Sequence, residues 1–113
     1  MLQQGVYDIV QPEVMMSDGI TGLRKIGALA QAYGRQIVPH CALADLGTIA
    51  ALHLVASWPR SDWLELIHDP PICDYRNRFS IFRDPPAVDK QGQISAPQIP
   101  GLGVEINPDL IVN

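Results

Sequence analysis

The sequence lacks the features that mark several classes of protein. Two cysteines, Cys41 and Cys73, occur in 113 residues, which is too few for a disulfide scaffold, so a reducing cytoplasm is the expected compartment. The start of the chain has no cationic segment followed by an apolar run, so we expect no secretory signal. No segment reaches the roughly 18 apolar residues of a membrane helix, so we expect no membrane partner.

Positive charge is also scarce. Eight Lys and Arg residues are scattered among twelve Asp and Glu residues, which gives a formal net charge of −4. A nucleic-acid surface needs a basic stripe, so we expect no nucleic-acid partner. The glycines around Leu102 do not open a helix in the GxGxxG pattern, which argues against a dinucleotide loop. Hydrophobic residues make up 47% of the chain, which indicates an ordered core.

The first two-thirds of the chain alternates between two kinds of segment. Short apolar runs at residues 6–11, 37–39 and 63–67 predict buried strands. Apolar residues at steps of three and four predict a helix over 22–33, and a nearly all-apolar segment predicts a second helix over 48–57. Strand–helix–strand connections of this length imply parallel pairing. The sequence therefore predicts the α/β class.

The last third has a different composition. Ten prolines are present and most of them lie in the second half of the chain, where they have no N–H to donate to a sheet ladder. Asp89-Lys90-Gln91-Gly92 predicts a hairpin turn between two short apolar pairs. Asn107-Pro108-Asp109 predicts the start of a short helix. The character of the sequence therefore changes after Ile67.

Ionisable residues stand at the ends of the three predicted strands: Glu13, His40 and Glu65. The carboxyl ends of parallel strands meet at one rim, where α/β proteins build active sites. If the first two strands end on the same rim, Glu13 and His40 can touch. A carboxylate beside a histidine fixes its tautomer and raises its basicity, so the pair can move a proton. The alternative is that they are two unrelated strand-end residues.

Other polar residues have simpler interpretations. His53 lies in a predicted helix among apolar neighbours, which favours a structural role. Cys41 follows His40 directly, and adjacent strand residues point to opposite faces, which favours a buried cysteine over a nucleophile. Asp45 is expected to be a loop or helix-cap residue.

The order of several short segments is similar to that of one enzyme family. These segments are Gln11-Pro12-Glu13, Asp18-Gly19-Ile20-Thr21, Ala28-Leu29-Ala30, Pro39-His40, Trp63-Leu64-Glu65 and Pro100-Gly101-Leu102-Gly103-Val104. Glu13 and His40 are 27 positions apart. Over nearly its whole length, the chain resembles the C-terminal part of the mandelate racemase, muconate lactonizing enzyme and acid-sugar dehydratase branch of the enolase superfamily.

This resemblance implies a more specific fold. Residues 1–84 would be the last strands and helices, about three βα units, of a TIM-type (β/α) barrel. Residues 85–113 would be the tail that packs on the family's capping domain, which is absent here. A C-terminal fragment of this kind cannot close an eight-stranded barrel. Its open sheet edges would favour association, so we expect a homo-oligomer.

The resemblance also implies roles for the strand-end residues. Glu13 and His40 would be the general base or acid on one face of a small carboxylate substrate, and Glu65 would hydrogen-bond the substrate carboxylate as it becomes an enediolate. The family usually has aspartate where Glu13 stands. The family's magnesium ligands lie on earlier barrel strands, so magnesium is expected in the intact parent, and no metal or cofactor is expected for this chain alone.

Three hypotheses follow from the sequence. In the first, an intact parent enzyme abstracts the α-proton of a hydroxy or sugar-acid carboxylate, leading to racemisation or dehydration, and the isolated chain is inactive. In the second, the chain is a non-catalytic structural or interaction fragment. In the third, it is a small α/β binding domain with its own pocket.

Overall fold

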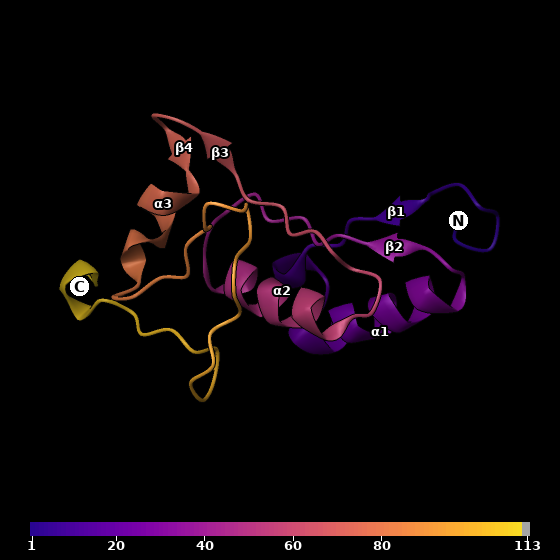
Figure 1. Ribbon diagram of the computed structural model, residues 1–113. Helices are drawn as coiled ribbons and strands as arrows, with labels where there is room; N and C mark the ends of the chain where they lie inside the picture. The colour runs from indigo at the N-terminus through magenta and orange to yellow at the C-terminus, as the bar shows by residue number, and fades with distance from the viewer. Residues whose placement is uncertain (112–113) are drawn as a thin grey trace.

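The computed structural model describes residues 1–111 as an elongated molecule of 48 × 27 × 26 Å (Figure 1). The helices and strands follow in the order β1 (Ile9–Val10), α1 (Gly19–Ala32), β2 (Gln36–Ile37), α2 (Leu46–Ser57), β3 (His68–Asp69), β4 (Cys73–Asp74) and α3 (Tyr75–Arg78). Short 3-10 helices cover Val14–Met16 (η1), Phe79–Ile81 (η2) and Pro108–Leu110 (η3). None of the described helices is long and apolar enough to cross a membrane.

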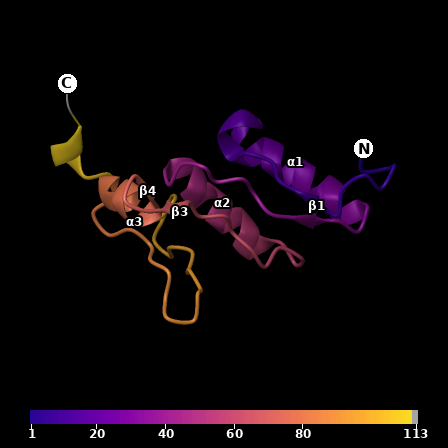
Figure 2. The ribbon, with the colours of Figure 1, turned by 90° about the horizontal axis from the view of Figure 1, so that it is seen from above.

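The first two strands pair in parallel, as the strand–helix–strand pattern predicts. Val10 lies opposite Ile37 in this register, and β1 and β2 run side by side in Figure 1. In both ribbon views this pair lies far from α3, at the opposite end of the molecule (Figures 1 and 2). The regular strands are shorter than predicted, because Pro12 and Pro39 have no N–H to continue the ladder. The pairing nevertheless extends further: the His40 N–H donates to the Pro12 carbonyl at 3.0 Å.

Helix α1 returns the chain from the end of β1 to the start of β2. It begins three residues before the predicted position and ends one residue earlier. Of the apolar residues predicted to share one face, Leu23 and Ala30 are fully buried, whereas Leu29 and Tyr33 are 50% and 45% exposed. Gly34 follows the helix in the left-handed region, at φ 65°, which a residue without Cβ adopts at little cost. This turn brings the chain back alongside β1.

Helix α2 is the central packing element. Asp45 caps its N-terminus, since Oδ1 accepts hydrogen bonds from the Gly47 and Thr48 N–H groups at 2.8 and 3.2 Å. This confirms the expectation of a loop or cap role for Asp45. Ile49 and Ala51 are fully buried, on different sides of the helix. The near-absence of polar residues in this segment is therefore explained by burial on two sides.

Two apolar clusters meet at α2. The first lies against α1 and contains Val14, Leu23, Cys41, Ala50, Ala51 and Leu54. The second lies towards the tail and contains Ala44, Ile49, Tyr75, Phe79 and Phe82. Tail residues Val88, Ile94, Leu102 and Val104 pack on the second cluster, and Leu102 also packs on the first. The tail thus covers a face of its own chain.

The predicted third strand is wrong. Residues 63–67 are irregular, and Trp63 is 70% exposed. Apolar composition alone does not make a strand without a neighbour to pair with, and the one backbone hydrogen bond of this segment within residues 1–111 is at its end, where the Ile67 carbonyl accepts the Tyr75 N–H at 2.9 Å. The structure instead places the antiparallel pair β3–β4 after it, with His68 opposite Asp74. The described residues are α/β but do not form a closed barrel.

The hairpin turn and the short helix predicted in the tail are both present. The Asp89 N–H donates to the Gln93 carbonyl at 2.8 Å, and Val88 and Ile94 form an antiparallel bridge, so this segment is a hairpin. Helix η3 begins at Pro108, where a short helix was predicted, and Asn107 caps it through a hydrogen bond from the Asp109 N–H. The division into residues 1–84 and residues 85–113 stays a prediction.

Candidate functional site

The structure brings Glu13 and His40 into contact. Each residue follows a proline at the carboxyl end of a parallel strand, and the two form an isolated parallel bridge. The His40 Nδ1 atom lies 3.2 Å from Oε2 of Glu13. The other carboxylate oxygen, Oε1, accepts the Met15 N–H at 3.2 Å and so caps η1. Both oxygens of Glu13 are therefore held in place.

The exposure of the pair suits contact with a ligand. The Glu13 side chain is 20% exposed, whereas that of His40 is 47% exposed. Because Nδ1 faces Glu13, Nε2 is the ring nitrogen left for another partner. A carboxylate on one ring nitrogen and an accessible second nitrogen is the arrangement of a histidine general base.

Glu65 reaches the same rim from an irregular segment. Its Oε2 accepts the Cys41 N–H at 3.2 Å, directly after His40 in the chain. Glu13 and His40 thus contact each other, and Glu65 contacts the backbone of the residue after His40, even though the strand predicted to carry Glu65 is absent.

The rim is acidic, and its carboxylates contribute to a raised pKa of the Cys41 thiol. The thiol is buried, and desolvation raises its pKa to about 12. A hydrogen bond with Thr48 opposes this shift, whereas the carboxylates of Glu13, Glu65 and Asp45 add to it. A thiol that stays protonated is a poor nucleophile. This confirms the interpretation of Cys41 as a buried cysteine.

His53 is a structural residue, as predicted. Its Nε2 lies 3.0 Å from the Leu102 carbonyl oxygen, which links α2 to the tail. This contact also explains how a half-buried polar residue fits in an apolar helix, because its ring nitrogen has a partner.

The sequence did not reveal a second histidine–carboxylate pair. His68 Nδ1 lies 3.5 Å from Oδ1 of Asp74 across β3–β4. Asp74 accepts the Arg76 N–H at 2.9 Å, and this hydrogen bond is the main cause of the lowered pKa of Asp74. The His68 ring stands edge-on to Tyr75, with the ring centroids 6.0 Å apart. The only sequence signal was Asp69-Pro70-Pro71, which indicates a turn but not its register.

A cavity of about 120 Å³ lies beside the first pair. It is lined by Glu13, Met15, Met16, His40, Ala42, Leu43 and Asp45. The pair therefore opens onto a space that can hold part of a small molecule, which supports a ligand-binding role for this rim.

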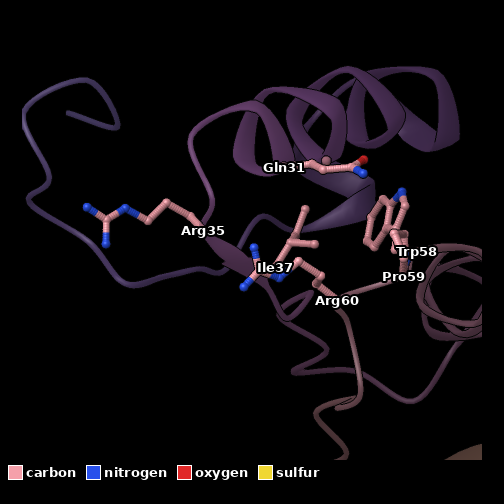
Figure 3. A pocket seen from close by; sticks show the side chains of 7 residues that line it. Gln31, Arg35, Ile37, Trp58, Pro59 and Arg60 are labelled. Carbon is pink, nitrogen blue, oxygen red and sulfur yellow. The ribbon is translucent and has the colours of Figure 1, made fainter.

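Two other hollows are less suited to acid–base chemistry. A hollow of about 10 Å³ beside Trp58 has room for roughly one water molecule. In Figure 3 the Arg35 side chain points away from it, and Arg35 pairs with Asp8 at 2.7 Å. A groove of about 480 Å³ runs between α2, residues 62–66 and the tail hairpin, but Asp62 is the one ionisable residue in its described lining. Neither hollow contains an acid–base pair.

The described residues do not fit a magnesium site. Within residues 1–111, no group of three or more His, Cys, Asp or Glu side chains is arranged to hold a metal ion. The carboxylates nearest His40 are also engaged: Glu13 with His40 and the Met15 N–H, and Glu65 with the Cys41 N–H.

Comparisons with known proteins match almost the whole chain. The family described as enolase C-terminal domain-like matches residues 1–110. The chain is 36% identical to an L-rhamnonate dehydratase of Saccharopolyspora erythraea, an alignment covering 97% of this chain and 27% of that protein. It is 32% identical to a D-galactonate dehydratase of Ralstonia pickettii, covering 98% of this chain and 29% of that protein.

Solved structures of similar proteins also match almost the whole chain. A mandelate racemase/muconate lactonizing enzyme-like protein from Roseovarius sp. TM1035 superposes with a TM-score of 0.81 at 30% identity, covering 96% of this chain and 26% of that one. An L-talarate dehydratase from Polaromonas sp. JS666, complexed with Mg and L-glucarate, gives a TM-score of 0.71 at 25% identity over the same shares. The chain spans less than a third of the length of these relatives.

Proposed function

This chain belongs to the enolase C-terminal domain-like family, and from that premise we propose that Glu13 and His40 form half of a proton-transfer site. The site would act on the carbon next to the carboxylate of a hydroxy or sugar acid. The observation that carries the proposal is the 3.2 Å contact between His40 Nδ1 and Glu13 Oε2 at the ends of two parallel strands. It leaves Nε2 of His40 to exchange a proton with carbon.

Each residue has a defined part in this proposal. His40 takes the α-proton at Nε2, and the Glu13 carboxylate stabilises the imidazolium that results. In a racemisation, a second acid on the opposite face of the substrate, outside the residues described here, would deliver a proton to carbon. In a dehydration, the proton held by His40 would leave with the departing hydroxyl as water. Glu65 is proposed to hydrogen-bond the substrate carboxylate as it becomes an enediolate. One of its oxygens accepts the Cys41 N–H, and the other would accept this hydrogen bond.

Enolase-superfamily enzymes generally use magnesium, which supplies the positive charge that stabilises an enediolate. The carboxylates described here do not form a site for it. We therefore assign magnesium binding to residues outside this chain, in a longer polypeptide of the size of the relatives. The 113-residue chain alone is then expected to be inactive.

The test uses the complete polypeptide that contains these residues, with magnesium and with acids such as L-rhamnonate and D-galactonate. His40→Asn should lower both turnover and exchange of the α-proton with deuterated water, by roughly 10²- to 10⁴-fold, because general acid–base catalysis is worth that much. His68→Asn is the matched control, since His68 has its own carboxylate partner at the other end of the molecule. Wild-type turnover in His40→Asn would contradict the proposal.

A second candidate function is a structural or interaction module. It is favoured by the large exposed apolar side chains, among them Ile9 at 48% and Trp63 at 70% exposed. Turnover by the complete polypeptide separates the two candidates, because loss of activity in His40→Asn is expected of a proton-transfer site and not of a purely structural module. Calorimetry with magnesium on the 113-residue chain tests the structural candidate further, since tight stoichiometric binding would rule out a purely structural role. Light scattering tests the expected homo-oligomer, and a compact, stable monomer would contradict that expectation.

A further inference from the structure

We propose that Ser61 is a positioning residue for His40. Its hydroxyl donates to the Ile37 carbonyl at 2.6 Å, three residues before His40, and the contact is buried. By fixing the backbone there, Ser61 aims the His40 ring at Glu13. This inference deepens the proposed function and rests on it, because the aim of the ring matters for catalysis only if His40 moves the proton.

The stretch of chain that carries His40, residues 37–41, is extended beyond the end of β2. Ile37 and Cys41 are 4% and 3% exposed, and the Pro39 side chain between them is fully buried. His40 alternates with these residues and is exposed. Such alternation between two faces is that of an extended strand. The direction of the His40 ring therefore depends on the backbone of this His40 stretch.

One edge of the His40 stretch pairs with β1 and the residues that follow it. The His40 N–H, for example, donates to the Pro12 carbonyl at 3.0 Å. The N–H and C=O groups of neighbouring strand residues point to opposite edges, so those of Ile37 and Cys41 face away from β1. The sheet of β1 and β2 has no third strand among residues 1–111. Buried backbone groups need partners, so side chains have to satisfy this second edge.

Two side chains of the segment after α2 satisfy the second edge. Ser61 donates to the Ile37 carbonyl. Oε2 of Glu65 accepts the Cys41 N–H at 3.2 Å. Both contacts join residues 24 positions apart in the sequence, so this segment runs beside the His40 stretch in the same direction. The two side-chain hydrogen bonds thus take the place of a strand ladder on that edge.

The burial of Ser61 makes its hydrogen bond hard to replace. The residue is 6% exposed, so water does not readily take the place of its hydroxyl. Without the hydroxyl, a buried carbonyl oxygen of the His40 stretch would lose its donor, which is unfavourable, and the backbone would shift to recover one. A displacement on the order of 1 Å can slow a reaction by about 100-fold. Such a shift here would move His40 relative to Glu13.

The test measures α-proton exchange with deuterated water in the complete polypeptide, with magnesium and with L-rhamnonate or D-galactonate. Ser61→Ala should lower the kcat of exchange by about tenfold and leave KM within about twofold, because the ring is misaligned while the other contacts to the acid are kept. Ser61→Thr keeps a hydroxyl and should return kcat to within about threefold of the wild-type value. Ser61→Cys, whose thiol is a weaker donor, should fall between Ser61→Ala and the wild type.

Phe82→Leu is the control for a general loss of stability. Phe82 is 3% exposed and belongs to the second apolar cluster, which contains no residue of the His40 stretch. This variant should lose stability and keep kcat within about twofold of the wild-type value. Urea unfolding of each variant checks that it is folded under the conditions of the assay.

A second readout needs no turnover. Nitrogen-15 NMR of the histidine-labelled polypeptide reports which ring nitrogen of neutral His40 carries the proton. Ser61→Ala should lower the share of rings protonated on Nδ1, which faces Glu13, and Ser61→Thr should restore it. Phe82→Leu should leave this share unchanged.

The outcomes separate the positioning role from the proposed function. Wild-type kcat and an unchanged His40 tautomer in Ser61→Ala would overturn the positioning role, as would an equal loss of kcat in Phe82→Leu. If Ser61→Ala does not fold, wild-type kcat in Ser61→Cys has the same meaning. Wild-type turnover in His40→Asn would contradict the proposed function alone, and the tautomer of His40 would still test whether Ser61 positions the ring.

Discussion

The two ends of this molecule each hold a histidine beside a carboxylate, and they differ in what surrounds the pair. Glu13 and His40 are 3.2 Å apart at the ends of parallel strands, beside a cavity. His68 and Asp74 are 3.5 Å apart across an antiparallel hairpin. A histidine next to a carboxylate is therefore not enough to indicate a functional site, and the position of the two residues in the fold has to be considered as well.

The surroundings of the second pair explain its structural character. Asp74 caps α3 through the Arg76 N–H, and His68 packs against Tyr75. The pair therefore connects the hairpin to the aromatic cluster around Phe79. Glu13 also caps a short helix, but its partner histidine faces an open space. Substitutions in the first end, which holds Glu13 and His40, therefore test chemistry. Substitutions in the second end, which holds His68 and Asp74, test stability.

The largest effect on stability is expected in the second end. Phe79 is 1% exposed and contacts two other aromatic rings. Phe79→Ala should lower the free energy of unfolding by about 3–5 kcal/mol, because it leaves a cavity in the core. Urea unfolding of the 113-residue chain measures this. Ile72→Ala, at an 82% exposed site nearby, should change it by less than about 0.5 kcal/mol. A loss below 1 kcal/mol for Phe79→Ala would show that this end has no tightly packed core.

The Cys41 thiol, in the first end of the molecule, should react slowly with alkylating reagents. Because burial raises the pKa of Cys41 to about 12, against 9.0 for a free thiol, its thiolate fraction at pH 8 should be lower by a factor on the order of 10² to 10³. Alkylation of Cys41 should slow accordingly relative to the urea-unfolded chain, as measured by mass spectrometry. Cys73, which is half-buried, serves as the internal comparison. Rapid labelling of Cys41 in the folded chain would contradict its burial in the apolar cluster against α1.

The same shift predicts a direction for stability against pH. Because the pKa of Cys41 is higher in the folded protein, the folded protein keeps the thiol proton over a pH range in which the unfolded chain loses it. The contribution is therefore fully present below pH 9 and is lost as the pH rises from 9 towards 12. Replacing Cys41 with alanine should flatten this alkaline decline in the free energy of unfolding. An unchanged slope would assign the decline to other groups.

The smallest effect is expected at the contact between α1 and the end of α2. A Cβ at Gly27 would lie 2.7 Å from the Trp58 ring, so Gly27→Ala should force the indole to move. The strain should exceed the gain in helix propensity, for a net loss of about 1 kcal/mol. Lys25→Ala, at an exposed position of the same helix, is the control in the unfolding experiment. A stabilised Gly27→Ala protein would mean that Trp58 moves freely.

The sequence predicted the first end better than the second. Apolar periodicity placed α1 and α2, and parallel pairing followed from their lengths, so Glu13 and His40 were expected at one rim. The contact of Glu65 with the Cys41 N–H was not predictable from periodicity, because its segment is irregular. The resemblance to the family pointed to Glu65, although the strand inferred there is absent.

The second end depends on contacts that leave little trace in the sequence. The register that pairs His68 with Asp74 depends on how Asp69-Pro70-Pro71 turns, and proline patterns indicate a turn without fixing strand partners. The tail likewise packs through Leu102 on both clusters, over a long separation in the chain. Such long-range contacts depend on shape, which a local pattern does not specify.

The pairing of Glu13 with His40 carries the proposed function, and the ring tautomer of His40 tests it most directly. Nitrogen-15 NMR of histidine-labelled protein at neutral pH distinguishes a protonated Nδ1 from a protonated Nε2. We predict that neutral His40 carries its proton on Nδ1, donated to Glu13, and that Glu13→Ala shifts this balance towards Nε2. A proton on Nε2 in the unsubstituted protein, unchanged by Glu13→Ala, would contradict the pairing.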